Sequence, residues 1–293
     1  MLRLNFWSGV AIFTWVLLAL FLAICRLLPV DWASAVGGWI GRTVGPRMGQ
    51  NRKAARNLER AFPANSAGEN RRIIRAMWDN LGRVIAEYPH LPRICARLEG
   101  GRCEVVGVEH FHAMAADGKP GVLFSAHLAN WEVAPYLARH ADLPLPLVYR
   151  APNNPWIDGL LKRMRDAPLF IPKGADGARE LLRLIRQGGH AGMLVDQKMN
   201  DGIPIPFFGR DAMTASAIAQ FALRFDCVLV PTHTERLAGA RFRITVHAPL
   251  EMKSTGDRAA DEREVMTRIN AMIEDWVRAR PEQWLWLHRR WPD

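Results

Sequence analysis

The chain has 293 residues, long enough to bury a sizeable core, and carries a formal net charge of +10 with an isoelectric point near 10.1. This charge favours anionic partners such as lipid headgroups, acidic proteins, phosphorylated substrates or nucleic acid. Four scattered cysteines without a C-x-x-C pair exclude the disulfide framework of small secreted domains and fit a reducing cytoplasm.

The N-terminal region contains an uncharged apolar stretch, Phe6–Cys25, about as long as the ~20 residues that a helix needs to cross a bilayer. We predict a membrane-anchoring or transmembrane helix within residues 1–28, followed by a single domain over residues 29–293. A cleaved signal peptide is the alternative, but its apolar core would be shorter and would end at small residues. Only Arg3 precedes the stretch, whereas basic residues follow it up to Arg60, so the positive-inside rule places the larger domain in the cytoplasm.

Residues 31–60 predict short helices interrupted near Gly45-Pro46. This segment is rich in arginine, and it forms either a collar that faces lipid headgroups or a solvated helix face. Residues 71–88 place apolar side chains at three- and four-residue spacing, which predicts an amphipathic helix packed on the core.

From residue 104 onward, short apolar runs alternate with helix-like segments. The predicted strands are Glu104–Val106, Gly121–Ala126, Leu145–Tyr149, Leu169–Ile171, His190–Val195 and Cys227–Pro231. The predicted helices are Glu109–Ala116, Trp131–His140, Pro155–Arg165, Ala175–Gln187, Ala212–Phe225 and Asp261–Arg278. This order predicts an α/β fold with a largely parallel, buried sheet flanked by helices. The alternating pattern of Arg241–His247 predicts a half-exposed strand near a sheet edge.

Several familiar catalytic motifs, including the G-x-S-x-G elbow, the phosphate-binding loop and the H-E-x-x-H zinc helix, are absent from the sequence. His127 and Glu132 lie where the predicted strand Gly121–Ala126 ends, the corner at which α/β sheets present reactive side chains. They can meet only if the intervening L-A-N-W forms a turn. A carboxylate on one imidazole nitrogen would leave the other free to take a proton from a hydroxyl. Taken alone, this spacing is more typical of a structural histidine.

Five motifs in order change this interpretation. They are A-H-L-A-N-W-E at 126–132, V-Y-R-A-P-N-N-P at 148–155, L-V-D-Q-K at 194–198, P-F-F-G-R-D-A-M-T at 206–214 and W-L-W-L-H-R-R-W at 284–291. Together with the N-terminal apolar stretch, this series resembles the late acyltransferases of lipid A biosynthesis, the lauroyl and myristoyl transferases. These belong to the wider glycerol-phosphate and lysophospholipid acyltransferase superfamily, in which many members carry Asp where this chain has Glu132.

The resemblance implies attack by a lipid hydroxyl on an acyl thioester, without a covalent acyl-enzyme. His127 would be the general base and Glu132 its orienting partner. The resemblance also implies acyl carrier protein as acyl donor, a lipid A precursor as acceptor, and no further cofactor or metal. The enzyme would act at the inner leaflet of the bacterial inner membrane. Acyl carrier proteins are acidic, which suits the net charge of +10.

Eight further residues are candidates for substrate binding: Arg150, Asn154, Arg165, Lys173, Asp196, Gln197, Phe207 and Phe208. The basic members could gather positive charge for sugar phosphates or for the phosphopantetheine of the carrier. Asp196 and Gln197 follow a predicted strand and either join this pocket or brace a loop. The two phenylalanines either wall an acyl groove or belong to the ordinary core.

Two alternative functions stay open at this point. The same chemistry could serve another membrane lipid, such as an aminolipid or a glycolipid. The chain could instead be a non-enzymatic, basic protein that binds a membrane surface or nucleic acid. It contains no recognisable nucleic-acid-binding module, and the ordered motifs argue against this class, so we predict no nucleic-acid partner.

Overall fold

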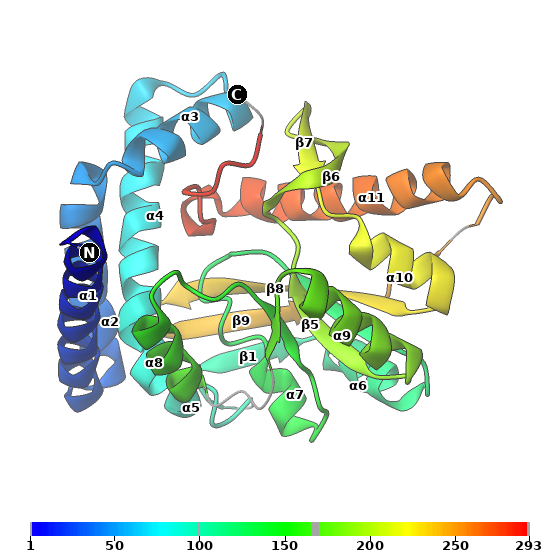
Figure 1. The fold of residues 1–293 in the computed structure, drawn as a ribbon, viewed down its shortest axis with the longest axis horizontal. Helices are drawn as coiled ribbons and strands as arrows, with labels where there is room; N and C mark the ends of the chain where they lie inside the picture. The colour runs from blue at the N-terminus through cyan, green and yellow to red at the C-terminus, as the bar shows by residue number, and fades with distance from the viewer. Residues whose placement is uncertain (1, 99, 166–169, 253, 292–293) are drawn as a thin grey trace.

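A seven-stranded sheet with the order β1-β9-β8-β2-β5-β3-β4 forms the centre of the protein (Figure 1). The computed structural model describes residues 2–98, 100–165, 170–252 and 254–291. The strands of this sheet are β1 Cys103–Val106, β2 Gly121–Ser125, β3 Leu147–Tyr149, β4 Phe170–Pro172, β5 His190–Leu194, β8 Val228–Ala238 and β9 Arg241–Val246. Neighbouring strands are parallel except for the antiparallel pair β8 and β9, which confirms the predicted α/β fold.

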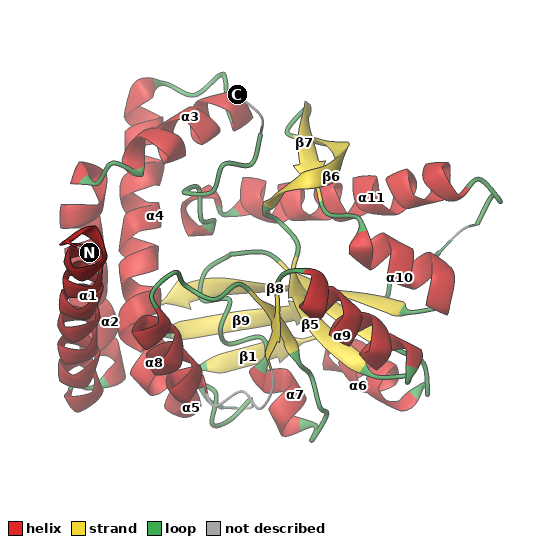
Figure 2. Cartoon of the chain, in the orientation of Figure 1, coloured by secondary structure: helices red, strands yellow, loops and turns green. Residues whose placement is uncertain are grey.

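Helices cover both faces of this sheet (Figure 2). In the part of the chain from residue 91 onward they are α5 Leu91–Ile94, α6 Val108–Ala116, α7 Tyr136–His140, α8 Pro155–Arg165, α9 Ala175–Arg186, α10 Ala217–Phe225 and α11 Arg258–Ala279. Alternate residues of β2 enter two different hydrophobic clusters, Val122 and Phe124 one cluster and Leu123 the other. All three side chains are buried. The central strand is therefore apolar throughout because both of its faces are covered.

The strand predictions differ from the structure mainly at element ends. β3 begins at Leu147 rather than Leu145, and the intervening Pro146 has no N–H to donate to a sheet. The predicted strand Leu169–Ile171 corresponds to β4, although Leu169 lies outside the described residues. β9 lies next to the edge strand β1, as its alternating pattern predicts. The predicted helix Trp131–His140 is shorter, because residues 128–135 form turns before α7.

One prediction is wrong in kind. The segment from Ala212 was expected to begin a helix, but residues up to Thr214 form β7 (Arg210–Thr214), which pairs with β6 (Lys198–Phe207) in a hairpin. Its two-residue turn, Phe208-Gly209, has positive φ at both positions (52° and 69°), as primed hairpin turns require. Two prolines in β6 obscured the strand pattern, since proline is depleted in strands.

Four helices precede α5 and the sheet: α1 Leu2–Leu27, α2 Val30–Val44, α3 Asn51–Ala61 and α4 Ala67–Glu87, with the 3-10 turns Gly45–Arg47 and Tyr88–His90. α1 and α2 lie against α4 at one end of the molecule (Figure 1). Small residues permit the close packing of α2 on α4, since a Cβ at Gly37 would lie 2.4 Å from the carbonyl oxygen of Gly82. The predicted break at Gly45-Pro46 is present between α2 and α3.

α1 is long and apolar enough, over Gly9–Leu27, to cross a membrane. One stripe of the helix packs on the rest of the protein, where Leu22 and Cys25 are buried and the ring nitrogen Nε2 of His90 lies 2.8 Å from the carbonyl oxygen of Cys25. The other side exposes large apolar residues, among them Phe13 and Leu20. The apolar helix is therefore confirmed, while its separation from the rest at residue 28 stays a prediction.

A partly buried histidine on β8, His233, predicts a pH-dependent stability. The ring of His233 stacks on Trp276 with centroids 4.8 Å apart, and its Nδ1 lies 3.0 Å from Nε2 of His247. Burial, followed by the neighbouring His247, lowers the pKa of His233 to about 4. The unfolded chain binds this proton below a pKa of about 6.5, so the free energy of unfolding should decrease as the pH falls from about 6.5 to 4.

Urea unfolding at pH 7 and pH 5 measures this dependence. We expect His233→Gln to unfold with a smaller difference between the two pH values than the wild type, because the variant lacks the titrating imidazole. An unchanged difference in the variant would show that His233 does not supply this linkage.

Candidate active site

Polar residues gather at one edge of the sheet because the strands that carry them are parallel. His127 follows β2, Asp196 follows β5, Arg150 follows β3 and Lys173 follows β4. The carboxyl ends of β2 and β5 are in register, with Ser125 paired with Leu194. Parallel strands end at a common edge, so chain segments more than twenty residues apart deliver their next side chains to one place.

His127 is held by Asp196. Its Nδ1 lies 2.7 Å from Oδ1 of Asp196, and its backbone N–H donates to Oδ2 over 2.8 Å. Trp284 donates from Nε1 to the same Oδ2 over 2.8 Å. Burial raises the pKa of Asp196, but the adjacent His127 and these hydrogen bonds lower it by more. The pKa of this carboxyl therefore lies below its usual range. The ionised carboxylate therefore accepts a hydrogen bond from the protonated Nδ1 of His127. This tautomer leaves Nε2 of His127 without a proton, as a hydrogen-bond acceptor.

The structure corrects the predicted contact between His127 and Glu132, because His127 binds Asp196 instead. Glu132 instead accepts hydrogen bonds from Arg165 (2.6 and 2.7 Å), Tyr88 Oη (2.7 Å) and Trp131 Nε1 (2.9 Å). The L-A-N-W segment does form a turn, with Ala129 at φ 49°, but this turn leaves Glu132 bound to the end of α8. A carboxylate 69 positions away in the sequence occupies the place that the spacing argument assigned to Glu132.

A cavity of about 480 Å³ opens beside His127. Six of the predicted site residues line it: His127, Glu132, Arg150, Arg165, Lys173 and Gln197. Apolar side chains form much of the remaining wall, including Leu145, Leu161 and Phe170. A cavity with a histidine, several cations and an apolar wall suits a substrate that combines an acyl chain with a charged group.

A second imidazole faces the same cavity. The amide nitrogen of Gln197 lies 3.2 Å from Nε2 of His127 and 2.9 Å from Nε2 of His288. Burial, and next the neighbouring His127, lower the pKa of His288 to about 4. A neutral His288 can therefore accept a hydrogen bond from Gln197 near neutral pH. The amide marks the direction from which a hydroxyl could approach His127.

Four candidate residues do not line this cavity, and one of them, Asp196, lies behind His127, which it binds. Asn154 donates from Nδ2 to the carbonyl oxygen of Ala11 over 2.7 Å, and so joins the start of α8 to α1. Phe207 and Phe208 are buried and pack edge to face with centroids 4.9 Å apart. Both contact the ring of Trp291, which places them in an aromatic core cluster rather than in an acyl groove.

The sequence did not single out four residues that complete the site: Tyr88, Trp131, Trp284 and His288. Tyr88 was predicted only as a core position of an amphipathic helix. Trp284 and His288 lie in the C-terminal W-L-W-L-H-R-R-W motif. This motif contributed to the family resemblance but did not predict a chemical role for either residue. Their functional position depends on the docking of the C-terminal tail, seen in the bridge between Leu128 and Trp284.

This fold and site define an α/β enzyme with a carboxylate-held histidine beside a partly apolar cavity. The chain belongs to the bacterial lipid A biosynthesis acyltransferase family, whose model matches residues 8–293. The predicted resemblance is thereby confirmed, and the protein is an acyltransferase of a membrane-associated bacterial family.

Individual relatives are distant but similar over most of their length. The lipid A biosynthesis acyltransferase of Haemophilus influenzae is 21% identical over 273 residues, covering 91% of this chain and 84% of the relative. The lipid A biosynthesis lauroyltransferase of Escherichia coli K12 is 24% identical over 242 residues, covering 80% and 76%. The myristoyltransferase of the same organism is 22% identical over 268 residues, covering 89% and 81%.

Proposed function

We propose that the protein transfers a fatty acyl chain from acyl carrier protein to a hydroxyl of a lipid A precursor, at the cytoplasmic face of the inner membrane. The observation that carries this proposal is the pairing of His127 with the buried Asp196 beside the cavity. The names of the relatives support the acceptor, and the net charge of +10 supports an acidic carrier protein as donor.

His127 acts as general base in this proposal. Its Nε2 takes the proton of the acceptor hydroxyl as the hydroxyl oxygen attacks the thioester carbonyl. The tetrahedral intermediate then breaks its C–S bond, and the imidazolium returns the proton to the departing thiolate. Asp196 stabilises the imidazolium between these two steps and fixes the tautomer. The products are an ester and the free thiol of the carrier, and no acyl group is bound to the enzyme.

Glu132 has a different role from the one that its spacing to His127 predicted. Its carboxylate accepts two hydrogen bonds from Arg165, whose guanidinium lies 4.5 Å from the ring centroid of Tyr149. Burial lowers the pKa of Arg165, but Glu132 and Tyr88 raise it more, so this arginine stays charged. Glu132 therefore positions a cation and Trp131 in the cavity wall, where they contact the substrate.

Arg150 provides a test of substrate binding because it is exposed and lines the cavity. If its guanidinium binds a substrate phosphate, Arg150→Ala should raise KM about tenfold, the equivalent of about 1.4 kcal/mol, with little change in stability. Arg150→Lys should recover only part of the loss, because lysine lacks the planar two-pronged donor. Arg179→Ala, on the exposed side of α9, is the matched control. A normal KM for Arg150→Ala would remove this residue from the site.

The reaction itself is tested with the purified full-length protein in detergent. We expect acyl transfer from acyl carrier protein to a lipid A precursor, detected by mass spectrometry as the added mass of one acyl group. An aminolipid and a glycolipid are offered in parallel as acceptors. Turnover of one of these, and none of the lipid A precursor, would contradict the proposed acceptor and support the alternative lipid.

The membrane orientation follows from charge and apolar surface together. The basic residues of α3 and its neighbours follow the apolar α1, and this order supports a cytoplasmic location of the catalytic part by the positive-inside rule. A site at the inner leaflet would give the cavity access to both a soluble carrier protein and a membrane lipid.

A further inference from the structure

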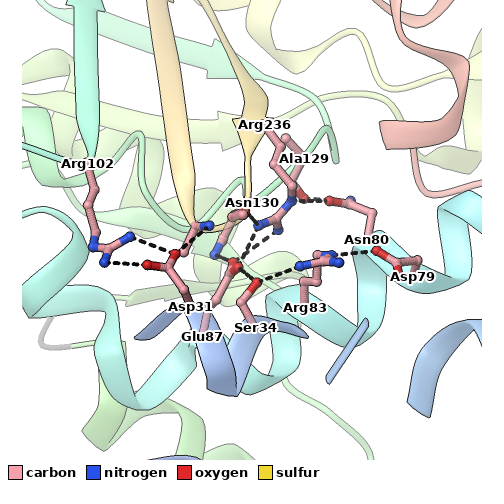
Figure 3. Close-up of polar contacts among 12 residues, drawn as sticks. Asp31, Ser34, Asp79, Asn80, Arg83, Glu87, Arg102, Ala129, Asn130 and Arg236 are labelled. Carbon is pink, nitrogen blue, oxygen red and sulfur yellow. Dashed lines mark hydrogen bonds and ion pairs between the residues drawn. The ribbon is translucent and has the colours of Figure 1, made fainter. Parts of the chain in front are cut away.

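A buried polar network lies behind the turn that joins His127 to Glu132 (Figure 3). Its centre is Glu87, the last residue of α4, which is fully buried. The carboxylate accepts hydrogen bonds from Ser34 Oγ (2.6 Å), Asn130 Nδ2 (2.8 Å) and both terminal nitrogens of Arg236 (2.5 and 3.0 Å). Four donors thus converge on one carboxylate that is fully buried and does not line the cavity.

Asn80 adds a second contact from the same face of α4. It lies seven residues before Glu87, and its Nδ2 donates to the carbonyl oxygen of Ala129 over 3.0 Å. Arg236 on β8 donates from Nε to Oδ1 of Asn80 over 2.9 Å. One guanidinium therefore binds both side chains of α4 that hold the turn, as Figure 3 shows.

The turn itself requires outside support. Ala129 has φ 49°, in the left-handed region that costs free energy for residues other than glycine. Its N–H donates to the carbonyl oxygen of Gln283 over 2.9 Å, and its carbonyl accepts from Asn80. The fully buried Asn130 binds Glu87 through Nδ2 and accepts the N–H of Glu132 on Oδ1 over 3.2 Å.

A displacement of this turn would also shift the side chains of His127 and Arg165 at the cavity. The ring of Trp131 packs edge to face on that of His127, with centroids 5.1 Å apart. Glu132, the next residue, holds Arg165 in the cavity wall. Apolar residues of similar volume often replace a buried ion pair without loss of stability, so stability alone does not account for this network.

We propose that Glu87, Asn80 and Arg236 are positioning residues for acyl transfer, which fix the turn at residues 128–131 and with it the placement of His127, Trp131 and Glu132. This inference rests on the proposed role of His127 as general base. None of the three positioning residues touches substrate; they act through Ala129 and Asn130.

Two substitutions on opposite sides of the same carboxylate separate positioning from stability. Asn130→Ala removes the link between Glu87 and the turn, together with the acceptor for the N–H of Glu132, but retains the Glu87–Arg236 pair. Ser34→Ala removes a hydrogen bond to Glu87 on the α2 side and leaves the turn contacts in place. Glu87→Gln tests the centre, because an amide retains only one of the two acceptor oxygens.

The readout is kcat and KM at a temperature at which thermal unfolding shows each variant to be folded. We expect Asn130→Ala and Glu87→Gln to lower kcat at least about tenfold with KM nearly unchanged, since a misplaced base slows the chemical step. Ser34→Ala should keep kcat within about twofold, even if its Tm falls. Should Glu87→Gln fail to fold, the comparison of kcat between Asn130→Ala and Ser34→Ala tests the positioning role by itself.

His127→Ala in the same assay separates failure of this inference from failure of the proposed function. An inactive His127→Ala together with wild-type kcat in Asn130→Ala would overturn the positioning role alone. Equal losses of kcat in Asn130→Ala and Ser34→Ala would also overturn it, because the effect would then follow stability. Wild-type turnover by His127→Ala would overturn the proposed function and this inference with it.

Discussion

Replacement of His127 by alanine is expected to lower the rate of acyl transfer by about 10²–10⁴-fold while the protein stays folded. The expectation follows from geometry, because Nδ1 of His127 is bound to Asp196 and its Nε2 is the basic nitrogen at the cavity. The neighbouring His288 does not offer an equivalent base, since burial is the largest cause of its lowered pKa and persists when His127 is replaced.

Initial rates with acyl carrier protein as donor, combined with circular dichroism of the same preparation, measure this loss. His112→Ala, an exposed position on α6, is the matched control and should turn over normally. A folded His127→Ala protein with wild-type acyl transfer would remove the general base from the mechanism.

Asp196→Asn should be nearly as damaging, with a loss of about 10²–10⁴-fold in kcat, because it imposes the wrong tautomer on His127. Oδ2 of Asp196 faces two obligate donors, the backbone N–H of His127 and the indole N–H of Trp284. The single oxygen of an asparagine must face these donors, which directs its NH₂ group toward Nδ1 of His127. Nδ1 would then have to accept, so Nε2 would carry the proton and could not act as a base.

Glu132→Gln provides the comparison for this prediction. We expect a smaller loss of kcat than in Asp196→Asn, because Glu132 binds Arg165 and Tyr88 rather than His127. Steady-state rates of both variants, measured on folded protein, decide between the two carboxylates. Normal turnover by Asp196→Asn with an inactive Glu132→Gln would restore the pairing that the H-x4-E spacing predicted.

The prediction of the sheet succeeded because its signal is local. A buried parallel strand is apolar along its whole length, so runs such as Gly121–Ser125 stand out from the helices around them. The same order of elements predicted that residues following different strands would meet. His127, Arg150, Lys173 and Gln197 all line one cavity as a result.

The partner of His127 could not be predicted in the same way. Spacing arguments compare residues that are close in sequence, whereas Asp196 reaches His127 across the β2–β5 register. Asn154 was misjudged for a related reason. A polar residue in a family motif suggests substrate, but here its amide satisfies a backbone carbonyl of α1, and that contact depends on how two distant helices pack.

Aromatic residues carried the least specific signal. Phe207 and Phe208 could have lined an acyl groove, and only the packing of the C-terminal tail shows that Trp284, Trp286 and Trp291 surround them. One of these indoles, that of Trp284, also donates to Asp196. The tail thus packs in the core and also donates to the carboxylate that binds His127, a combination that depends on tertiary structure and has no local sequence pattern.

The most direct test of the proposed function is mass spectrometry of lipid A from the source bacterium after deletion of the gene. We expect lipid A from the deletion strain to be lighter by one acyl chain. We further expect the wild-type gene to restore the missing mass and a gene encoding His127→Ala not to restore it. Lipid A of unchanged mass in the deletion strain, or full restoration by His127→Ala, would contradict the proposed function.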